Sequence, residues 1–380
     1  MTGVEPFDIR VTEEQAADLR ERLRRTRWAQ EAEGGWGLGA DLAYLGELCE
    51  HWAGAYDFSR LERLNELGSA RAGGLHFLRL EPADAGAADP VVLLHGWPSG
   101  PIEYERAAQL VAQSGREVIV PSLPGYAWSD DPGEPLNVAG VAVRLRSLIE
   151  EVLGHSSYAV AGGDWGAIVA ARMAFDAPQS VAALHVTTPH TLPLPGDLAA
   201  PPLSEAEAQW VERARRWRRR RGWHVAAQGT APDAISAGLT DSPAGLAAYL
   251  VSKYRGWSDC RGDVERRFSK DELCDFLTMY WATGSIASSM RLYLGEGRDR
   301  WRLAAEERIQ APAGAALFAG EMGGDESEPP GLNPPRQWTE RALSDLRRWT
   351  EIDSGGHFAP FEEPEAYSGE LVTFLDQIRA

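Results

Sequence analysis

Residues 158–175, YAVAGGDWGAIVAARMAF, join an apolar run to a helical pattern through a turn rich in glycine. Gly162, Gly163 and Gly166 favour a sharp strand-to-helix turn, because glycine lacks the Cβ atom that clashes where backbone approaches backbone. Such a turn pushes the side chain at its tip outward. Asp164 stands at that tip, and we expect it to face a substrate.

Short apolar runs alternate with helical patterns from residue 75 onward. This repetition predicts a mostly parallel sheet flanked by helices, which is an α/β fold. The apolar runs are LHFLRLEP at 75–82, PVVLLHGWP at 90–98, EVIVPSLPG at 117–125, YAVAGGDWG at 158–166 and VAALHVTTP at 181–189.

Helical patterns stand before and inside this α/β repeat. Residues 12–25 begin with Thr12 as an N-cap and continue as an amphipathic helix, and residues 41–56 predict a second helix. Strand signals stop after the 181–189 run and resume at AGAALFAGE, and a helical insertion of this kind is usually a lid. We predict four segments: an N-terminal wrapping segment at 1–75, a core at 76–194, a helical cap at 195–310 and the rest of the core at 311–380.

Composition limits the partners of the chain. The 380 residues are 44% hydrophobic, which is enough for a sizeable core, and 56 acidic against 38 basic residues give a net charge of −18. This acidity argues against nucleic acid or an anionic membrane as the main partner and favours a neutral or cationic ligand. The basic run ERARRWRRRRGWH at 212–224 has the composition of a nucleic-acid patch, but we interpret it as a cap helix with a solvated basic face.

Other patterns bear on cofactors and location. The three cysteines, Cys49, Cys260 and Cys274, show no CxxC spacing and predict reduced, buried thiols. We find neither metal-ligand spacing nor a GxGxxG or GxxxxGK[ST] motif, and we expect no metal and no cofactor. No stretch approaches the roughly 20 apolar residues of a membrane span. We therefore expect a soluble, cytoplasmic protein, and the preference for arginine over lysine suggests a bacterial source.

Four fragments place reactive groups in a recognisable order. LLHGWPSG at 93–100 follows a strand and brings a backbone N–H near Trp97, and GGDWG supplies Asp164 as nucleophile with a second N–H at Trp165. Glu321 follows the strand ALFAG, and His357 lies in SGGHFAPFEEPE. Nucleophile, acid and histidine in this order are typical of an α/β-hydrolase fold, in which the nucleophile is usually a serine.

An aspartate nucleophile restricts the reaction. A carboxylate that attacks an ester or amide gives an anhydride, whereas attack on an sp³ carbon gives an ester that activated water can hydrolyse. Epoxides and alkyl halides are therefore the expected substrates. His357 would activate the water, and Glu321 would orient His357; Asp325 and Glu326 are alternatives for that acid.

The chain resembles the microsomal-type epoxide hydrolases over nearly its whole length. Their motifs are matched by FDIRVTEEQAADLRERLRRTRW, HGWP, GGDWG, DSPAGLAAYLVSKYRGWSD, YWATGSIASSMRLYLGE and GGHFAPFEEPE. The resemblance implies opening of an epoxide by water to a vicinal diol, without a cofactor, and homodimers are common in the family. It also implies that two cap tyrosines protonate the epoxide oxygen.

One of these tyrosines is matched and the other is not. Tyr293 lies in YWATGSIASSMRLY, but the second tyrosine position reads His224, beside Trp223. Either His224 or Trp223 assists through its N–H, or Tyr293 works largely alone. This departure favours a specialised, bulky epoxide from secondary metabolism over a xenobiotic that is detoxified.

Two other functions fit parts of the pattern. A haloalkane dehalogenase shares the aspartate and the following tryptophan, but the N-terminal segment and Tyr293 argue against it. An inactive scaffold usually lacks the nucleophile or the histidine, and both Asp164 and His357 are present.

Overall fold

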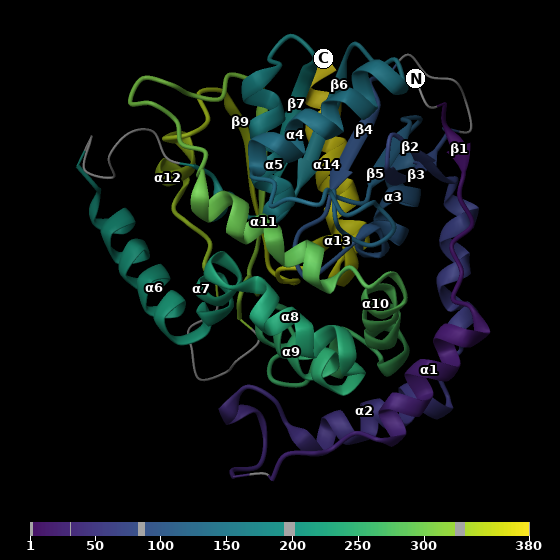
Figure 1. Cartoon of the computed structure of the whole chain (residues 1–380). Helices are drawn as coiled ribbons and strands as arrows, with labels where there is room; N and C mark the ends of the chain where they lie inside the picture. The colour runs from purple at the N-terminus through teal and green to yellow at the C-terminus, as the bar shows by residue number, and fades with distance from the viewer. Residues whose placement is uncertain (1–2, 31, 83–87, 194–201, 324–330, 380) are drawn as a thin grey trace.

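A nine-stranded sheet forms the centre of the part of the chain that the structure describes, in the order β1-β2-β3-β5-β4-β6-β7-β8-β9. The computed structural model describes residues 3–30, 32–82, 88–193, 202–323 and 331–379 (Figure 1). From β4 to β9 neighbouring strands pair in parallel, and only β1, β2 and β3 add antiparallel pairs, so the predicted mostly parallel sheet is confirmed. The strands are β1 (Glu5–Pro6), β2 (Ser69–Ala72), β3 (Leu75–Leu80), β4 (Val91–Leu94), β5 (Val118–Pro121), β6 (Tyr158–Gly162), β7 (Val181–Val186), β8 (Ala313–Phe318) and β9 (Leu346–Ile352).

The register of the parallel strands gathers their following loops at one edge. Leu94 pairs with Gly162, Gly162 pairs with Val186, and Phe318 of β8 pairs with Ile352 of β9. Strands that are buried on both faces read as continuous apolar runs, which is why VVLL and YAVAG are fully buried. The loops that carry the predicted reactive residues therefore share the carboxyl edge of the sheet.

Helices cover both faces of the sheet. The chain moves from β4 to β5 in one direction along the sheet and from β5 through β6 to β7 in the other. Because crossovers between parallel strands are right-handed, the helix of the first connection lies on the opposite face from those of the next two. The first connection holds α3 (Glu105–Ala112), which packs on α14 (Pro364–Arg379), and the next two hold α4 (Val138–Arg146) and α5 (Trp165–Asp176), which pack on each other.

Six helices stand between β7 and β8 and form the cap. Figure 1 shows them together below the sheet, and Tyr254 of α9 and Tyr280 of α10 donate hydrogen bonds to the backbone oxygens of Pro98 and Ser99, at 2.6 and 3.1 Å. The cap therefore covers the loop after β4. Most of the basic run, residues 212–221, lies in α6, whereas Trp223 and His224 begin α7. The cap helices are α6 (Glu205–Arg221), α7 (Trp223–Thr230), α8 (Pro232–Asp241), α9 (Pro243–Trp257), α10 (Lys270–Thr283) and α11 (Ile286–Arg298).

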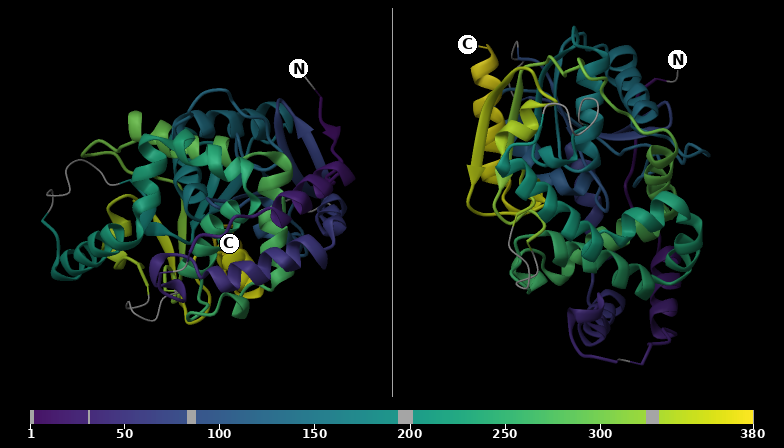
Figure 2. Two further views of the ribbon diagram at one scale, coloured as in Figure 1. Left: turned by 60° about the horizontal axis from the view of Figure 1, so that its bottom comes forward. Right: turned by 90° about the vertical axis from the view of Figure 1, so that its left-hand side faces the viewer.

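The N-terminal segment runs along the outside of the cap. Figures 1 and 2 show α1 (Glu13–Arg24) and α2 (Leu42–Gly54) extending past the cap helices, far from the sheet that β1 joins. Thr12 caps α1 in a capping box with Gln15, so the expected N-cap is confirmed. Gln15 also donates to the Ala282 backbone oxygen at 2.7 Å, which links α1 to the cap.

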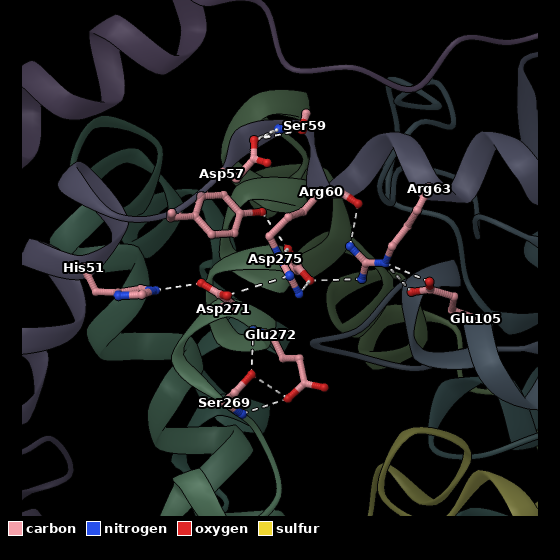
Figure 3. Close-up of polar contacts among 11 residues, drawn as sticks. His51, Asp57, Ser59, Arg60, Arg63, Glu105, Ser269, Asp271, Glu272 and Asp275 are labelled. Atoms are coloured by element: carbon pink, nitrogen blue, oxygen red, sulfur yellow. Dashed lines mark hydrogen bonds and ion pairs between the residues drawn. The ribbon is translucent and has the colours of Figure 1, made fainter.

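A buried ion-pair network joins the N-terminal segment, the cap and the core (Figure 3). Asp275 on α10, with a side chain only 1% exposed, accepts hydrogen bonds from Arg60 and Arg63 at 2.9 to 3.0 Å. Tyr56 adds a further bond at 2.7 Å, and Arg63 also binds Glu105 at the start of α3. Both arginines belong to the 3₁₀ helix at Phe58–Leu67, which leads into β2.

Two short helices, α12 (Arg336–Glu340) and α13 (Ala359–Glu362), complete the described chain.

The three cysteines, Cys49, Cys260 and Cys274, are buried, reduced thiols, as the sequence predicts. Among the described residues, no helix has both the length and the apolar character needed to cross a bilayer.

Candidate active site

Asp164 sits in a strained turn between β6 and α5. Its backbone has φ 51° and ψ −126°, a conformation that costs a non-glycine residue about 1 to 3 kcal/mol. The Asp164 N–H donates to Oγ1 of Thr188 at 2.6 Å, which helps to fix this geometry. A Cβ atom at Gly166 would lie 1.9 Å from the Leu94 backbone oxygen, so only glycine allows α5 to approach β4 this closely.

Backbone N–H groups hold the Asp164 carboxylate. The Trp97 N–H donates to Asp164 Oδ1 at 2.9 Å, and the Trp165 N–H also bonds the carboxylate. A Cβ atom at Gly96 would lie 2.4 Å from Asp164 Cβ, so the glycine of HGWP makes room for the carboxylate. These are the two N–H groups that the sequence predicts for an oxyanion hole.

His357 links Asp164 to Glu321. Its Nε2 atom lies 3.7 Å from Asp164 Oδ2, and its Nδ1 atom lies 2.9 Å from Glu321 Oε1. The Glu321 and His357 residues are only 1% and 4% exposed. The predicted nucleophile, base and acid therefore meet in one buried cluster, whereas the alternatives Asp325 and Glu326 lie outside the described residues.

Burial and charge oppose each other in this cluster, and the pKa values of Asp164 and His357 both end above their ordinary values. Burial raises the pKa of Asp164, although His357 and the two backbone N–H groups partly offset it. Burial alone would lower the pKa of His357, but the carboxylates of Glu321, Asp164 and Glu103 outweigh it and raise this pKa to about 9. With this pKa, His357 is protonated at neutral pH beside Asp164 and Glu321.

Aromatic side chains from the cap surround the Trp97 ring. Tyr293 of α11 contacts both tryptophans of the oxyanion hole, with ring centroids 4.8 Å from Trp165 and 5.8 Å from Trp97. His224 of α7 stacks on Trp97 at 5.8 Å, with the two planes 11° apart. The structure thus packs the rings of Tyr293 and His224 against Trp97, whose backbone N–H bonds Asp164.

Trp223 lies elsewhere, although it is the neighbour of His224. Its side chain is 52% exposed, and its ring contacts Tyr249 at 5.3 Å. His224 is 3% exposed, and its Nδ1 atom has no hydrogen-bond partner among the described residues. Burial and the charge of Lys253 lower the pKa of His224 to about 3, so its imidazole is neutral.

Several further groups lie around this site and were not predicted from the sequence. His190 lies 3.8 Å from Glu321, and burial raises the pKa of Glu103, which lies near His357, to about 7. Tyr249 contacts Trp97 and accepts a hydrogen bond from Gln228 at 2.8 Å. Tyr249 and Trp257 of α9 are eight residues apart, and this helical spacing is a signal that could have shown one aromatic face.

A separate cleft of about 210 Å³ lies between α1 and the cap. Arg22 of α1 and Leu239 and Trp281 of the cap are among the residues that line it. Neither Asp164 nor His357 borders this cleft, so it is not the site of the predicted chemistry.

Comparisons with known proteins agree with the geometry. The family described as "Epoxide hydrolase N terminus" matches residues 4–104, and the family described as "Alpha/beta hydrolase family" matches residues 91–370. The chain is 32% identical to juvenile hormone epoxide hydrolase of Bombyx mori over 421 residues, which cover 100% of this chain and 87% of the relative.

Solved structures show the same fold. The structure of juvenile hormone epoxide hydrolase from Bombyx mori has a TM-score of 0.86 at 28% identity and covers 100% of this chain and 95% of that chain. Epoxide hydrolase from Aspergillus niger has a TM-score of 0.81 at 24% identity, with 100% and 97% covered. The chain therefore belongs to the microsomal-type epoxide hydrolases of the α/β-hydrolase fold and is an epoxide hydrolase.

Proposed function

We propose that the chain converts an epoxide to a vicinal diol through a covalent ester on Asp164. The observation that carries this proposal is the contact of His357 with both carboxylates, at 3.7 Å from Asp164 and 2.9 Å from Glu321. This arrangement supports one carboxylate as nucleophile and the other as the partner of the base.

In the first step Asp164 Oδ attacks an epoxide carbon, and the bond from that carbon to the ring oxygen breaks. The ring oxygen takes the phenol proton of Tyr293, whose pKa burial raises well above its ordinary value, so the phenol is protonated at rest. A neutral His224 provides at most an N–H donor. General acid help of this kind is worth about 10² to 10⁴ in rate.

Ester formation prepares His357 for the second step. The ester removes the Asp164 charge, which is one of the charges that raise the pKa of His357. The imidazolium then passes its proton to the Tyr293 phenolate, which restores the phenol and leaves His357 neutral. Neutral His357 removes a proton from water, and the resulting hydroxide attacks the ester carbonyl.

The backbone N–H groups of Trp97 and Trp165 stabilise the oxyanion of this attack, because they already bind the carboxylate. The intermediate collapses to the diol and the Asp164 carboxylate, and the proton held by His357 restores the resting pair. Over the whole cycle one water molecule is consumed, and the protonation states of the side chains return to those at the start.

We further propose that the natural epoxide is bulky and comes from secondary metabolism. The support is the replacement of the second cap tyrosine by His224, which stacks on Trp97 inside the site. Faster turnover of simple aryl and alkyl epoxides than of polycyclic ones would contradict this part of the proposal.

The mechanism is tested with His357→Gln and intact-mass measurement after incubation with epoxides and alkyl chlorides. Loss of the base should leave the ester on Asp164, with a mass gain equal to the whole epoxide on the peptide that contains Asp164. The double variant with Asp164→Asn is the control and should gain no mass. A gain equal to an alkyl group from a chloride would indicate dehalogenation, and labelling at another residue would overturn the proposal.

A further inference from the structure

We infer that Lys253, on the active-site face of the cap, forms a subsite for a carboxylate carried by the epoxide substrate. The inference rests on the proposed epoxide hydrolysis and names the class of substrate that this site would select.

The position of Lys253 on α9 places it beside the reacting groups. Tyr249, Lys253 and Trp257 are four residues apart along the helix and share one face. The rings of Tyr249 and Trp257 lie 5.6 and 6.0 Å from the ring of Trp97, whose N–H binds Asp164. The rings of Tyr249 and Trp257, and behind them Trp97, therefore connect Lys253 to the site of Asp164.

The ammonium group of Lys253 lacks an anionic partner. The residue is 4% exposed, and no oxygen atom of the described residues bonds Nζ, which keeps some contact with solvent. Its neighbours are three rings, with Nζ at 4.6 Å from Trp223, 5.4 Å from Tyr249 and 5.9 Å from Trp257. Rings attract a cation but do not satisfy three N–H donors, so an anion can replace the water that now meets them.

The other lysine of the chain shows the usual arrangement. Lys270 bonds the carboxylate of Glu265 and lies near a second carboxylate, that of Glu47, at 3.9 Å. In a chain with a net charge of −18, acidic partners are abundant. The absence of one at Lys253 therefore distinguishes this position from an ordinary structural lysine.

The charge around Lys253 favours an anion in spite of the acidity of the whole chain. Burial and the charge of Arg221 lower the pKa of Lys253 to about 8, so most of the ammonium stays charged at neutral pH. After burial, the charges of Lys253, His357 and Arg218 also lower the pKa of His224, so several cations lie near this part of the cap. The expectation of a neutral or cationic ligand, taken from net charge alone, does not describe this local field.

The single positive charge of the subsite favours a carboxylate. One ammonium can neutralise one negative charge, whereas a phosphate dianion calls for several donors. The rings of Trp223, Tyr249 and Trp257 offer apolar surface to the hydrocarbon that joins the carboxylate to the epoxide. The substrate class is therefore an epoxide with an apolar body that ends in a carboxylic acid.

The test compares ligands that differ only in this group. Equilibrium titrations with 4-phenylbutanoate and 4-phenylbutanamide are followed by tryptophan fluorescence, for the wild type and for Lys253→Met, Lys253→Arg and Lys270→Met. The same four proteins are assayed on a terminal epoxide with a carboxylate and on its primary amide. We expect the wild type to bind and convert the acid about 10 to 100 times better than the amide, as charge-assisted hydrogen bonds allow.

Lys253→Met should remove this preference with little change for the amide, Lys253→Arg should retain most of it, and the control Lys270→Met should match the wild type. Equal affinity of the wild type for acid and amide, or equal loss of both in Lys253→Met, would overturn the subsite. Because the binding arm needs no turnover, a Lys253-dependent preference without diol formation would support the subsite and contradict the proposed hydrolysis.

Discussion

The Nε2 atom of His190 lies 3.8 Å from Glu321 Oε1, the same oxygen that His357 contacts at 2.9 Å. Burial lowers the pKa of His190, so this second imidazole is neutral and does not compete as a cation for the carboxylate. Within the described residues, His357 is the one hydrogen-bond partner of the Glu321 side chain. The Glu321 carboxylate therefore acts on His357, whose pKa it raises.

Glu321→Gln should slow hydrolysis of the Asp164 ester more than its formation. The variant keeps the shape of the side chain but removes the charge that raises the pKa of His357. We expect the hydrolytic step to fall by about 10² to 10⁴, measured as ester that accumulates in intact-mass time courses.

His190→Gln is the matched control for Glu321→Gln and should change the same step less than about threefold, since no hydrogen bond is lost. Hydrolysis at the wild-type rate in Glu321→Gln would mean that another acid orients His357. Asp325→Asn and Glu326→Gln would then identify it.

The stability that His357 contributes should depend on pH. The pKa of His357 is about 9 in the folded chain, above its ordinary value of 6.5, so the folded state binds the proton more tightly. Its contribution is fully present below pH 6.5 and is lost as the pH rises through 9. His357→Gln should therefore destabilise the chain more at pH 6 than at pH 10, by on the order of 3 kcal/mol.

Urea unfolding of both proteins at the two pH values checks this difference. An equal loss of stability in His357→Gln at pH 6 and at pH 10 would contradict the raised pKa of His357.

Local motifs predicted that Asp164, His357 and Glu321 lie together, because each motif fixes its own geometry. The glycines around Asp164 dictate a turn with φ 51°, and parallel strands bring the loops of Trp97, Asp164 and His357 to one edge. Both features follow from short stretches of sequence and from the chirality of the fold.

Contacts between distant helices were not accessible in this way. Trp223 and His224 are neighbours in sequence, but successive residues of a helix point about 100° apart, so only His224 faces Trp97. The contacts of Lys253 on α9 and of His190 after β7 depend on the elements packed against them, so they could not be predicted from the sequence. The sequence contains the residues of these contacts but not the packing that joins them.

The buried network of Figure 3 should make a large contribution to stability through Asp275. Asp275→Asn leaves Arg60 and Arg63 without the carboxylate that they share, and breaking a buried ion pair costs about 3 to 5 kcal/mol. Thermal and urea unfolding should show a loss of that size.

Asp271→Asn, one turn earlier on α10, is the control for the buried network. Its side chain is 41% exposed, and its pairs with His51 and Arg60 should be worth less than about 1 kcal/mol. Equal losses in the two variants would show that the network does not hold the N-terminal segment to the cap through Asp275.

His224→Tyr should accelerate ring opening. The imidazole of His224 is neutral and a weak acid, whereas a phenol at the same place, against Trp97 and 6.0 Å from the Tyr293 ring, would be a second proton donor. Since one positioned general acid is worth at least about 10²-fold, a gain of about tenfold in the single-turnover rate of ester formation is expected for a donor added without further adjustment. His224→Phe fills the same stack without a donor and should not accelerate the step, so an equal gain in both variants would assign the effect to packing rather than to proton transfer.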